Sequence, residues 1–241
     1  MLSLQPTEHL TGIQISGDYW DIEELIQAIY EIIGDEKRYY HFQGSRNRLL
    51  GLCLKLRQAS KGTKTIQEIP NGIHKGIMKN RKTLYLEKNI YFAVEIFLPE
   101  LLFAALSFND FIDLYKETID DSEWNDTVTT IRKFQAQVAR CIEVFMTEEH
   151  YVVFLTTLHT KSPLFHQYAT QYVDVLNLEY LALSKDQRKE LLAAFALRLL
   201  TEDNTYVTLK QQLLEVTAIT KQALHEVPLN LHYPDEENVV W

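Results

Sequence analysis

Residues 10–34 read LTGIQISGDYWDIEELIQAIYEIIG, and this segment predicts a strand that leads directly into a helix. Residues 10–16 alternate apolar and polar side chains, which is the pattern of a half-buried strand. Asp18 can cap a helix whose buried face repeats at spacings of three, four and seven. That face comprises Ile22, Leu25, Ile26, Ile29, Ile32 and Ile33. Gly34 can end the helix, because a residue without a β-carbon readily adopts the left-handed conformation.

The region after this unit predicts a second helix, several short strands and one buried helix. The second helix is expected to begin at Ser45 and to end near Gly62, with its leucines along one face. Pro99 suits the first turn of another helix, where its missing N–H needs no partner. Residues 101–106 are apolar on all sides, so this helix is expected to be buried between layers. The expected strands are 63–69, 73–78, 83–86 and 90–96.

Beyond residue 120 the strand patterns stop and helical patterns continue. A seam with alternating spacings of four and three predicts a helix of about six turns. The seam comprises Trp124, Val128, Ile131, Gln135, Val138, Ile142 and Phe145. Gln135 within an apolar seam can specify pairing with another helix, at some cost in stability. Further helices are expected at 147–159, after Ser162, after Ser184 and at 205–225.

Together these patterns predict an α+β protein in which helices dominate. Residues 1–120 are expected to combine helices with antiparallel strands, and residues 121–232 to form an all-helical bundle. Residues 233–241 form an acidic tail, which is expected to be mobile unless the terminal Trp241 docks.

Charge is distributed unevenly along the chain, whose formal net charge is −9. Residues 37–82 contain twelve basic residues and a single acidic one, Glu68, so this basic segment carries +11. The basic residues are Lys37, Arg38, Arg46, Arg48, Lys55, Arg57, Lys61, Lys64, Lys75, Lys79, Arg81 and Lys82. Such a segment can bind nucleic acid or another polyanion, and Tyr39, Tyr40 and Phe42 at its start can stack on unpaired bases.

The same charges have a second interpretation, in which acidic parts of the chain neutralise the basic segment. Residues 1–36 contain eight acidic residues and no Lys or Arg, and neutralisation can occur within the fold or across a dimer. Arg48 and Lys55 are expected to point away from the leucine face of their helix, as solvated charges do.

The sequence contains no recognisable cofactor or catalytic motif: no glycine-rich phosphate loop and no nucleophile elbow. The best candidate metal cluster is Glu148, Glu149, His150, His159 and His166. Its histidines are nine and seven residues apart, whereas one helix presents two ligands at spacings of three or four. We therefore predict neither a metal site nor a cofactor.

A nuclease-like set of acids also fails on geometry. Asp21, Asp35, Glu36 and Lys37 are the residue types that hold Mg²⁺ and a water molecule in many nucleases. Asp21 lies in the first turn of the predicted helix and Asp35 just after its end, so roughly 20 Å separate them.

The amino terminus has neither a basic start nor an apolar core, so no signal peptide is expected. The apolar run near residues 96–108 is too short and too interrupted to span a bilayer. Cys53 and Cys141 lie in apolar helical patterns and are expected to be buried, reduced thiols. These features predict a cytoplasmic protein that does not bind membranes.

Several segments resemble an uncharacterised bacterial domain family of unknown function. They are residues 10–18, 48–53, 62–72, 89–92 and the stretch from Pro99-Glu100 to Asn109-Asp110. The resemblance covers about the first 115 residues. The family has an Asp and a His on the second helix where this chain has Lys55 and Gln58. The resemblance implies a bacterial α+β domain and implies no activity.

The leading functional hypothesis is a non-enzymatic bacterial binding or regulatory subunit that acts through protein–protein contacts, within an assembly such as a defence or toxin-neutralising system. Its partner, or a second copy of the chain, is expected to contact the predicted seam, at Trp124, Val128, Ile131, Gln135 and Val138. The first alternative is nucleic-acid binding through residues 37–82. The second alternative is an unrecognised metal-dependent hydrolase that uses Asp21, Asp35 or His159.

Overall fold

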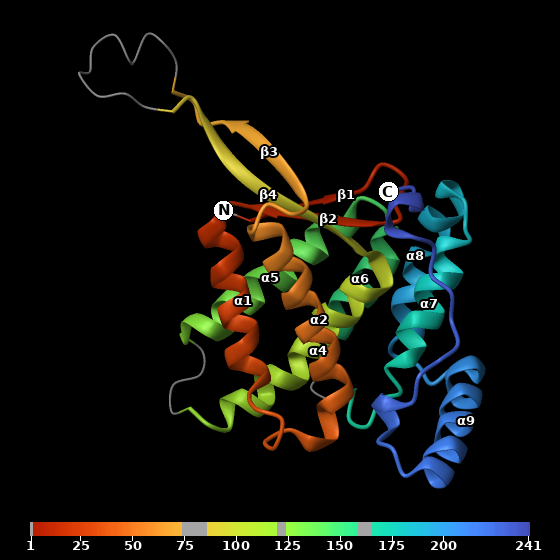
Figure 1. The fold of residues 1–241 in the computed structure, drawn as a ribbon. Coiled ribbons are helices and arrows are strands. Elements are labelled where there is room, and N and C mark those ends of the chain that lie inside the picture. Colours follow the sequence, from red (N-terminus) through yellow and green to blue (C-terminus); the bar gives the residue numbers. More distant parts are fainter. Residues whose placement is uncertain (1, 74–85, 120–123, 159–164) are drawn as a thin grey trace.

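The computed structural model describes residues 2–73, 86–119, 124–158 and 165–241 and contains one antiparallel sheet beside many helices (Figure 1). The strand order is β1-β2-β4-β3. The strands are β1 Ser3–Pro6, β2 Gly12–Gly17, β3 Thr65–Pro70 and β4 Lys88–Phe97. In the central pair, Ile13 lies opposite Ile96 and Ile15 opposite Val94, and all four side chains are buried. One face of the sheet is therefore a core face.

The helices confirm the predicted α+β fold in which helices dominate. Figure 1 shows the sheet above α1, α2 and α4, with α7, α8 and α9 grouped beside them. The α-helices are α1 Tyr19–Ile33, α2 Gln43–Ser60, α4 Leu98–Lys116, α5 Asp126–Glu143, α6 Glu148–Leu158, α7 Gln171–Leu181, α8 Lys185–Arg198 and α9 Asn204–Thr220. The described residues also form the short 3₁₀ helices η1 Tyr40–Phe42, η2 Leu224–Glu226 and η3 Glu236–Asn238.

Helix α4 lies at the centre of the core. Residues 101–106 are buried on every side, as their sequence predicts, and α4 contacts the sheet, α1, α2, α5, α6, α7 and α8. One hydrophobic cluster contains residues from both sides of residue 120. The division into two parts near residue 120 stays a prediction.

Capping residues in the sequence predicted several helix ends correctly. The Asp18 carboxylate accepts the Asp21 N–H at 2.9 Å, and the Asp21 carboxylate accepts the Asp18 N–H at 3.1 Å, so α1 begins in a capping box. Gly34 ends α1 with a positive φ of 57°. Ser184 caps α8 in the same reciprocal way.

Other segments differ from the sequence expectations or lie beyond the described residues. Strand β1 had not been expected, because four residues that end in Pro6 carry too little alternation to identify it. The strands expected at 73–78 and 83–86, and the helix start expected at Ser162, lie almost wholly outside the described residues. In the part of the chain that the structure describes, no helix is long and apolar enough to cross a membrane.

The acidic tail docks on the sheet through its last residues. The ring of Trp241 stacks on that of Phe97 at a centroid distance of 5.0 Å. The backbone N–H of His9 donates to the Trp241 carbonyl at 3.2 Å, and the Thr11 hydroxyl donates to the Val240 carbonyl at 2.5 Å. Residues 221–241, which we call the C-terminal segment, therefore return from α9 to the sheet and cover its end.

Candidate ligand-binding pocket

A pocket of about 710 Å³ lies between helix α2 and the C-terminal segment. Strand β4 and helix α4 close one end, and the first two turns of α7 line the opposite side. Helix α2 contributes one stripe of residues at spacings of three and four, which places them on a single helix face. This stripe comprises Gly44, Asn47, Arg48, Gly51, Leu52, Lys55 and Gln58.

The two glycines of this stripe differ in their surroundings. A β-carbon at Gly44 would lie 3.1 Å from the Thr170 side chain and 3.2 Å from the β-carbon of His225, so close packing explains that glycine. A β-carbon at Gly51 would meet no atom within 4 Å outside the backbone of its own helix. Glycine inside a helix costs about 1 kcal/mol relative to alanine. In the described structure no packing contact accounts for this cost at Gly51, which faces the pocket.

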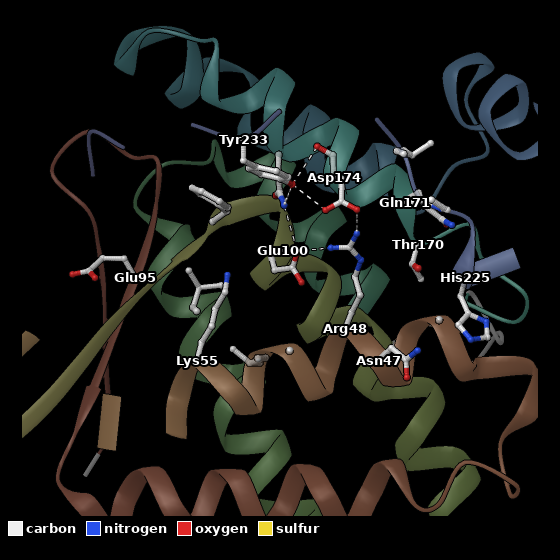
Figure 2. A pocket seen from close by; sticks show the side chains of 18 of the residues that line it. Asn47, Arg48, Lys55, Glu95, Glu100, Thr170, Gln171, Asp174, His225 and Tyr233 are labelled. Atoms are coloured by element: carbon white, nitrogen blue, oxygen red, sulfur yellow. Dashed lines mark hydrogen bonds and ion pairs between the residues drawn. The ribbon is translucent and has the colours of Figure 1, made fainter. Parts of the chain in front are cut away.

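Arg48 is the centre of a polar network on the pocket floor (Figure 2). Its guanidinium donates to the Glu100 carboxylate at 2.7 Å and forms a second ion pair with Asp174. The Tyr233 hydroxyl donates to Asp174 Oδ1 at 2.9 Å, and the Asn177 amide donates to Tyr233 at 3.1 Å. The network joins four segments of the chain: α2, α4, α7 and the C-terminal segment.

Burial and charge act in opposite directions on Arg48. Burial disfavours the charged guanidinium, but the carboxylates of Glu100 and Asp174 outweigh it and raise the pKa of Arg48 above its usual value. Burial and the nearby Asp174 carboxylate also raise the pKa of Tyr233, so its hydroxyl stays protonated and acts as a donor. The pocket floor is therefore a fixed, charged network that holds α2 against α7.

Three buried polar atoms of pocket residues have no hydrogen-bond partner among the described residues: Arg48 Nε, Asn177 Oδ1 and Gln171 Oε1. The Gln171 amide group donates to the carbonyls of Leu224 at 2.7 Å and Val227 at 2.9 Å, which fixes its orientation. An unsatisfied buried polar atom costs about 1–3 kcal/mol. Bound water or a ligand in the pocket would lower that cost.

Lys55 lies at the other end of the α2 stripe. Its ammonium is 5.7 Å from the centroid of the Phe97 ring, and it contacts no carboxylate among the described residues. Phe97 also stacks on Tyr233 at 5.9 Å and on Trp241 at 5.0 Å. The facing wall is largely apolar and comes from the C-terminal segment: Val227, Pro228, Leu229, Tyr233, Pro234, Val239 and Trp241.

The structure separates the residues of the basic segment. Arg48, Lys55 and Lys64 line the pocket, and the expectation that Arg48 is a solvated charge is wrong, because two carboxylates enclose it. Arg46 donates to the Gly34 carbonyl at 3.1 Å, at the end of α1. The Arg57 guanidinium lies 5.3 Å from the centroid of the Tyr30 ring.

The remaining members of the basic segment do not share one described surface. Lys37 and Arg38 are exposed before α2, and Lys61 is exposed after it. A helix of 18 residues is about 27 Å long, so these two groups lie far apart. Lys75, Lys79, Arg81 and Lys82 lie outside the described residues.

The predicted seam on α5 lies inside the molecule. Val128, Ile131, Gln135 and Val138 are buried where α5 packs against α1 and α4, and Gln135 donates to the Ala105 carbonyl at 2.6 Å. These four side chains belong to the chain's own core, which corrects the expectation that they contact a partner. Trp124, just before the helix, is 83% exposed.

The described residues that were candidates for a metal site or a reactive thiol have structural roles or are buried. No three His, Cys, Asp or Glu side chains of the described residues lie close enough together to hold a metal ion, and His159 lies outside those residues. Asp21 belongs to the capping box of α1. Burial raises the pKa of Cys53 to about 12 and that of Cys141 to about 11, so both thiols are protonated at neutral pH.

Sequence reasoning identified Arg48, Lys55 and Lys64 as candidates but missed the residues that face them. On α7, polar residues at 171, 174 and 177 follow one helix face, and this periodicity was the signal that could have identified them. Tyr233 and Trp241 carried no such signal, because only the path of the C-terminal segment brings them to α2.

Comparison with known proteins supplies a family. No curated protein and no solved structure matches the chain. The model of a domain of unknown function, DUF6904, matches residues 2–241. The resemblance to an uncharacterised family is thereby confirmed, and it extends over almost the whole chain rather than about its first 115 residues. The chain belongs to the DUF6904 family.

Proposed function

We propose that the protein is a non-enzymatic binding subunit of a bacterial, cytoplasmic regulatory system, and that it binds a small ligand in the pocket beside α2. The observation that carries this proposal is Gly51, a helical glycine that faces a pocket of about 710 Å³ and has no packing contact to explain it. An occupant that needs the space beside the helix would provide the missing reason.

The chemistry of the pocket favours binding over catalysis. The charges of Arg48, Glu100 and Asp174 are paired with one another, so they hold segments together. The raised pKa of Tyr233 keeps its hydroxyl protonated, which makes it a hydrogen-bond donor and no general base at neutral pH. A pocket of this size, with an apolar wall and a few fixed polar groups, has the features of a small-molecule site.

The location of the pocket also supports a regulatory role. One wall is the C-terminal segment, whose ends are tied to α7 by Gln171 and to the sheet by Trp241. A ligand that contacts both α2 and this segment stabilises their association, and a protein partner, or a second copy, that contacts the segment would respond to the ligand. We therefore propose that a protein partner contacts the C-terminal segment, and no longer the α5 seam.

The test is affinity selection from a bacterial metabolite extract, with bound compounds identified by mass spectrometry. Gly51→Leu fills the pocket beside the helix, and Leu54→Ala, at an exposed position of the same helix, is the matched control. We expect the wild type and Leu54→Ala to retain the same compounds and Gly51→Leu to lose them. Retention of the same compounds by all three proteins, or of none by the wild type, would contradict the proposal.

A further inference from the structure

We propose that the pocket ligand is a small organic anion with an apolar body, and that its anionic group binds the ammonium of Lys55 beside Gly51. This inference rests on the proposed binding function of the pocket. It identifies the chemical class of the ligand and the residue that selects it.

The first reason to expect an anionic ligand is the environment of Lys55. The residue is partly buried, and its ammonium lies near the Phe97 ring and contacts no carboxylate among the described residues. A counter-charge stabilises a cation in such a position. Arg48 does not need one, because Glu100 and Asp174 already pair with it. An anion in the pocket therefore gains most next to Lys55.

The second reason is the arrangement of Arg48, Gly51 and Lys55 on one face of α2, which indicates where the anionic group binds. Arg48 and Lys55 are seven residues apart on one face, which is about 10 Å, and Gly51 lies between them. Without a side chain at Gly51, a ligand group can approach the helix surface and reach Lys55 from the middle of the pocket. The carboxylates of Glu100 and Asp174 pair with Arg48 and repel an anion from that end. Glu95, which also lines the pocket, accepts a hydrogen bond from the Gln14 amide at 2.7 Å.

The wall opposite α2 indicates the chemistry of the rest of the ligand. Val227, Leu229 and Tyr233 present apolar surface from the C-terminal segment, opposite the polar stripe of α2. A ligand between the two walls buries an apolar body on one side and places its anionic group on the other. Carboxylates and phosphates share the chemistry that an ammonium recognises, and a pocket of about 710 Å³ is in the range that takes a drug-sized molecule.

Two fluorescent probes test this inference with the full-length protein. Anilinonaphthalene sulfonate has an aromatic, apolar body and a sulfonate group, and N-phenyl-1-naphthylamine has the same ring system without the sulfonate. We expect Lys55→Met to lower the affinity for the sulfonate about tenfold and to leave the affinity for the neutral probe unchanged. Lys61→Met, which removes an exposed lysine outside the pocket, is the matched control and should alter neither affinity.

The variants separate failure of the ligand class from failure of the pocket. If Gly51→Leu abolishes binding of both probes but Lys55→Met changes neither, the pocket binds ligands and the inference about anions is wrong. If Gly51→Leu changes neither probe, or the wild type binds neither, both the inference and the proposed function are contradicted. Competition of the sulfonate by 2-naphthoate or by 1-naphthyl phosphate then tells carboxylate from phosphate, and displacement by neither contradicts the inference.

Discussion

At the residue scale, Gly51 and Arg48 are opposite cases of unusual residues on one helix face. Arg48 carries a charge into a largely enclosed position, and two carboxylates and a network of hydrogen bonds compensate for its desolvation. Gly51 weakens the helix, and no contact in the described structure compensates for it. The fold explains Arg48, and we propose that a ligand explains Gly51, so the two residues give different predictions on substitution.

Gly51→Ala is expected to stabilise the ligand-free protein by about 1 kcal/mol, because alanine favours the helix and its methyl group enters open space. Urea denaturation measures the change. Gly44→Ala is the matched control and should destabilise the protein, since its methyl group would crowd Thr170 and His225. A loss of stability in Gly51→Ala would mean that backbone geometry, rather than an occupant, requires this glycine.

Asp203 gives a pH dependence that can be measured. Burial acts to raise its pKa, but hydrogen bonds from the Tyr172 hydroxyl, the Tyr206 N–H and Arg198 outweigh burial and hold the pKa below its usual value. A carboxyl group whose pKa is lowered on folding adds stability above its unfolded pKa, and this stability is lost as pH falls through the folded pKa. Asp203→Asn keeps a side chain that can cap α9 and removes the charge.

The wild type is therefore expected to be about 1 kcal/mol more stable than Asp203→Asn near pH 7. The difference should begin to fall near about pH 4 and should be lost as the pH falls through the folded pKa. Thermal denaturation across this pH range measures it. Asp235→Asn, at an exposed position in the C-terminal segment, should show no such pH-dependent difference. A difference for Asp203→Asn that stays constant down to pH 3 would contradict the role of the charge.

The sequence reveals the role of a residue when its partner is close along the chain, and not when the partner is distant along the chain. The caps at Asp18 and Ser184 were predictable, because each cap bonds to a residue three positions away. The environment of Arg48 was not, because its partners Glu100 and Asp174 are 52 and 126 positions away. A basic residue opposite a leucine face is usually solvated, and only the tertiary fold places two acids beside this one.

At the scale of elements, the C-terminal segment was the least predictable part of the site. Amphipathic helices such as α1 and α5 follow periodic patterns, and their positions were predicted closely. The C-terminal segment has no period, and its path depends on single contacts, those of Gln171 and Trp241. The pocket could not be predicted for this reason, since nine of the 25 residues that line it come from this segment.

Trp241→Ala should release the end of the C-terminal segment, because it removes the stacking on Phe97. We expect a loss of about 1–2 kcal/mol in stability and faster hydrogen exchange in residues 224–241. Trp20→Ala removes a tryptophan that is 76% exposed and is the matched control, for which we expect neither effect. Unchanged exchange in Trp241→Ala would mean that the hydrogen bonds from the His9 N–H and the Thr11 hydroxyl hold the segment without the ring.

At the scale of the whole molecule, contacts across residue 120 are extensive. Helix α5 packs on α1, α7 packs on α4, and the hydrophobic cluster is continuous across both. Arg188 of α8 adds a polar connection: its buried guanidinium donates to the His9 carbonyl at 2.9 Å and to the Thr11 hydroxyl at 2.7 Å. The same side chain donates to the Tyr180 carbonyl at 3.1 Å, so it links α8 to both α7 and the turn before β2.

These contacts predict that the parts on either side of residue 120 unfold together, although chains of this length often populate intermediates. Hydrogen exchange across a urea series should rise at the same urea concentration in α1 and in α8. Arg188→Met removes the polar connection and leaves buried acceptors unpaired, so it should lower that shared midpoint while the two helices still unfold together. Separate midpoints in the wild type would instead support two domains that meet near residue 120. In that case the pocket, whose walls come from both sides of residue 120, would lie at a domain interface and could open without unfolding either domain.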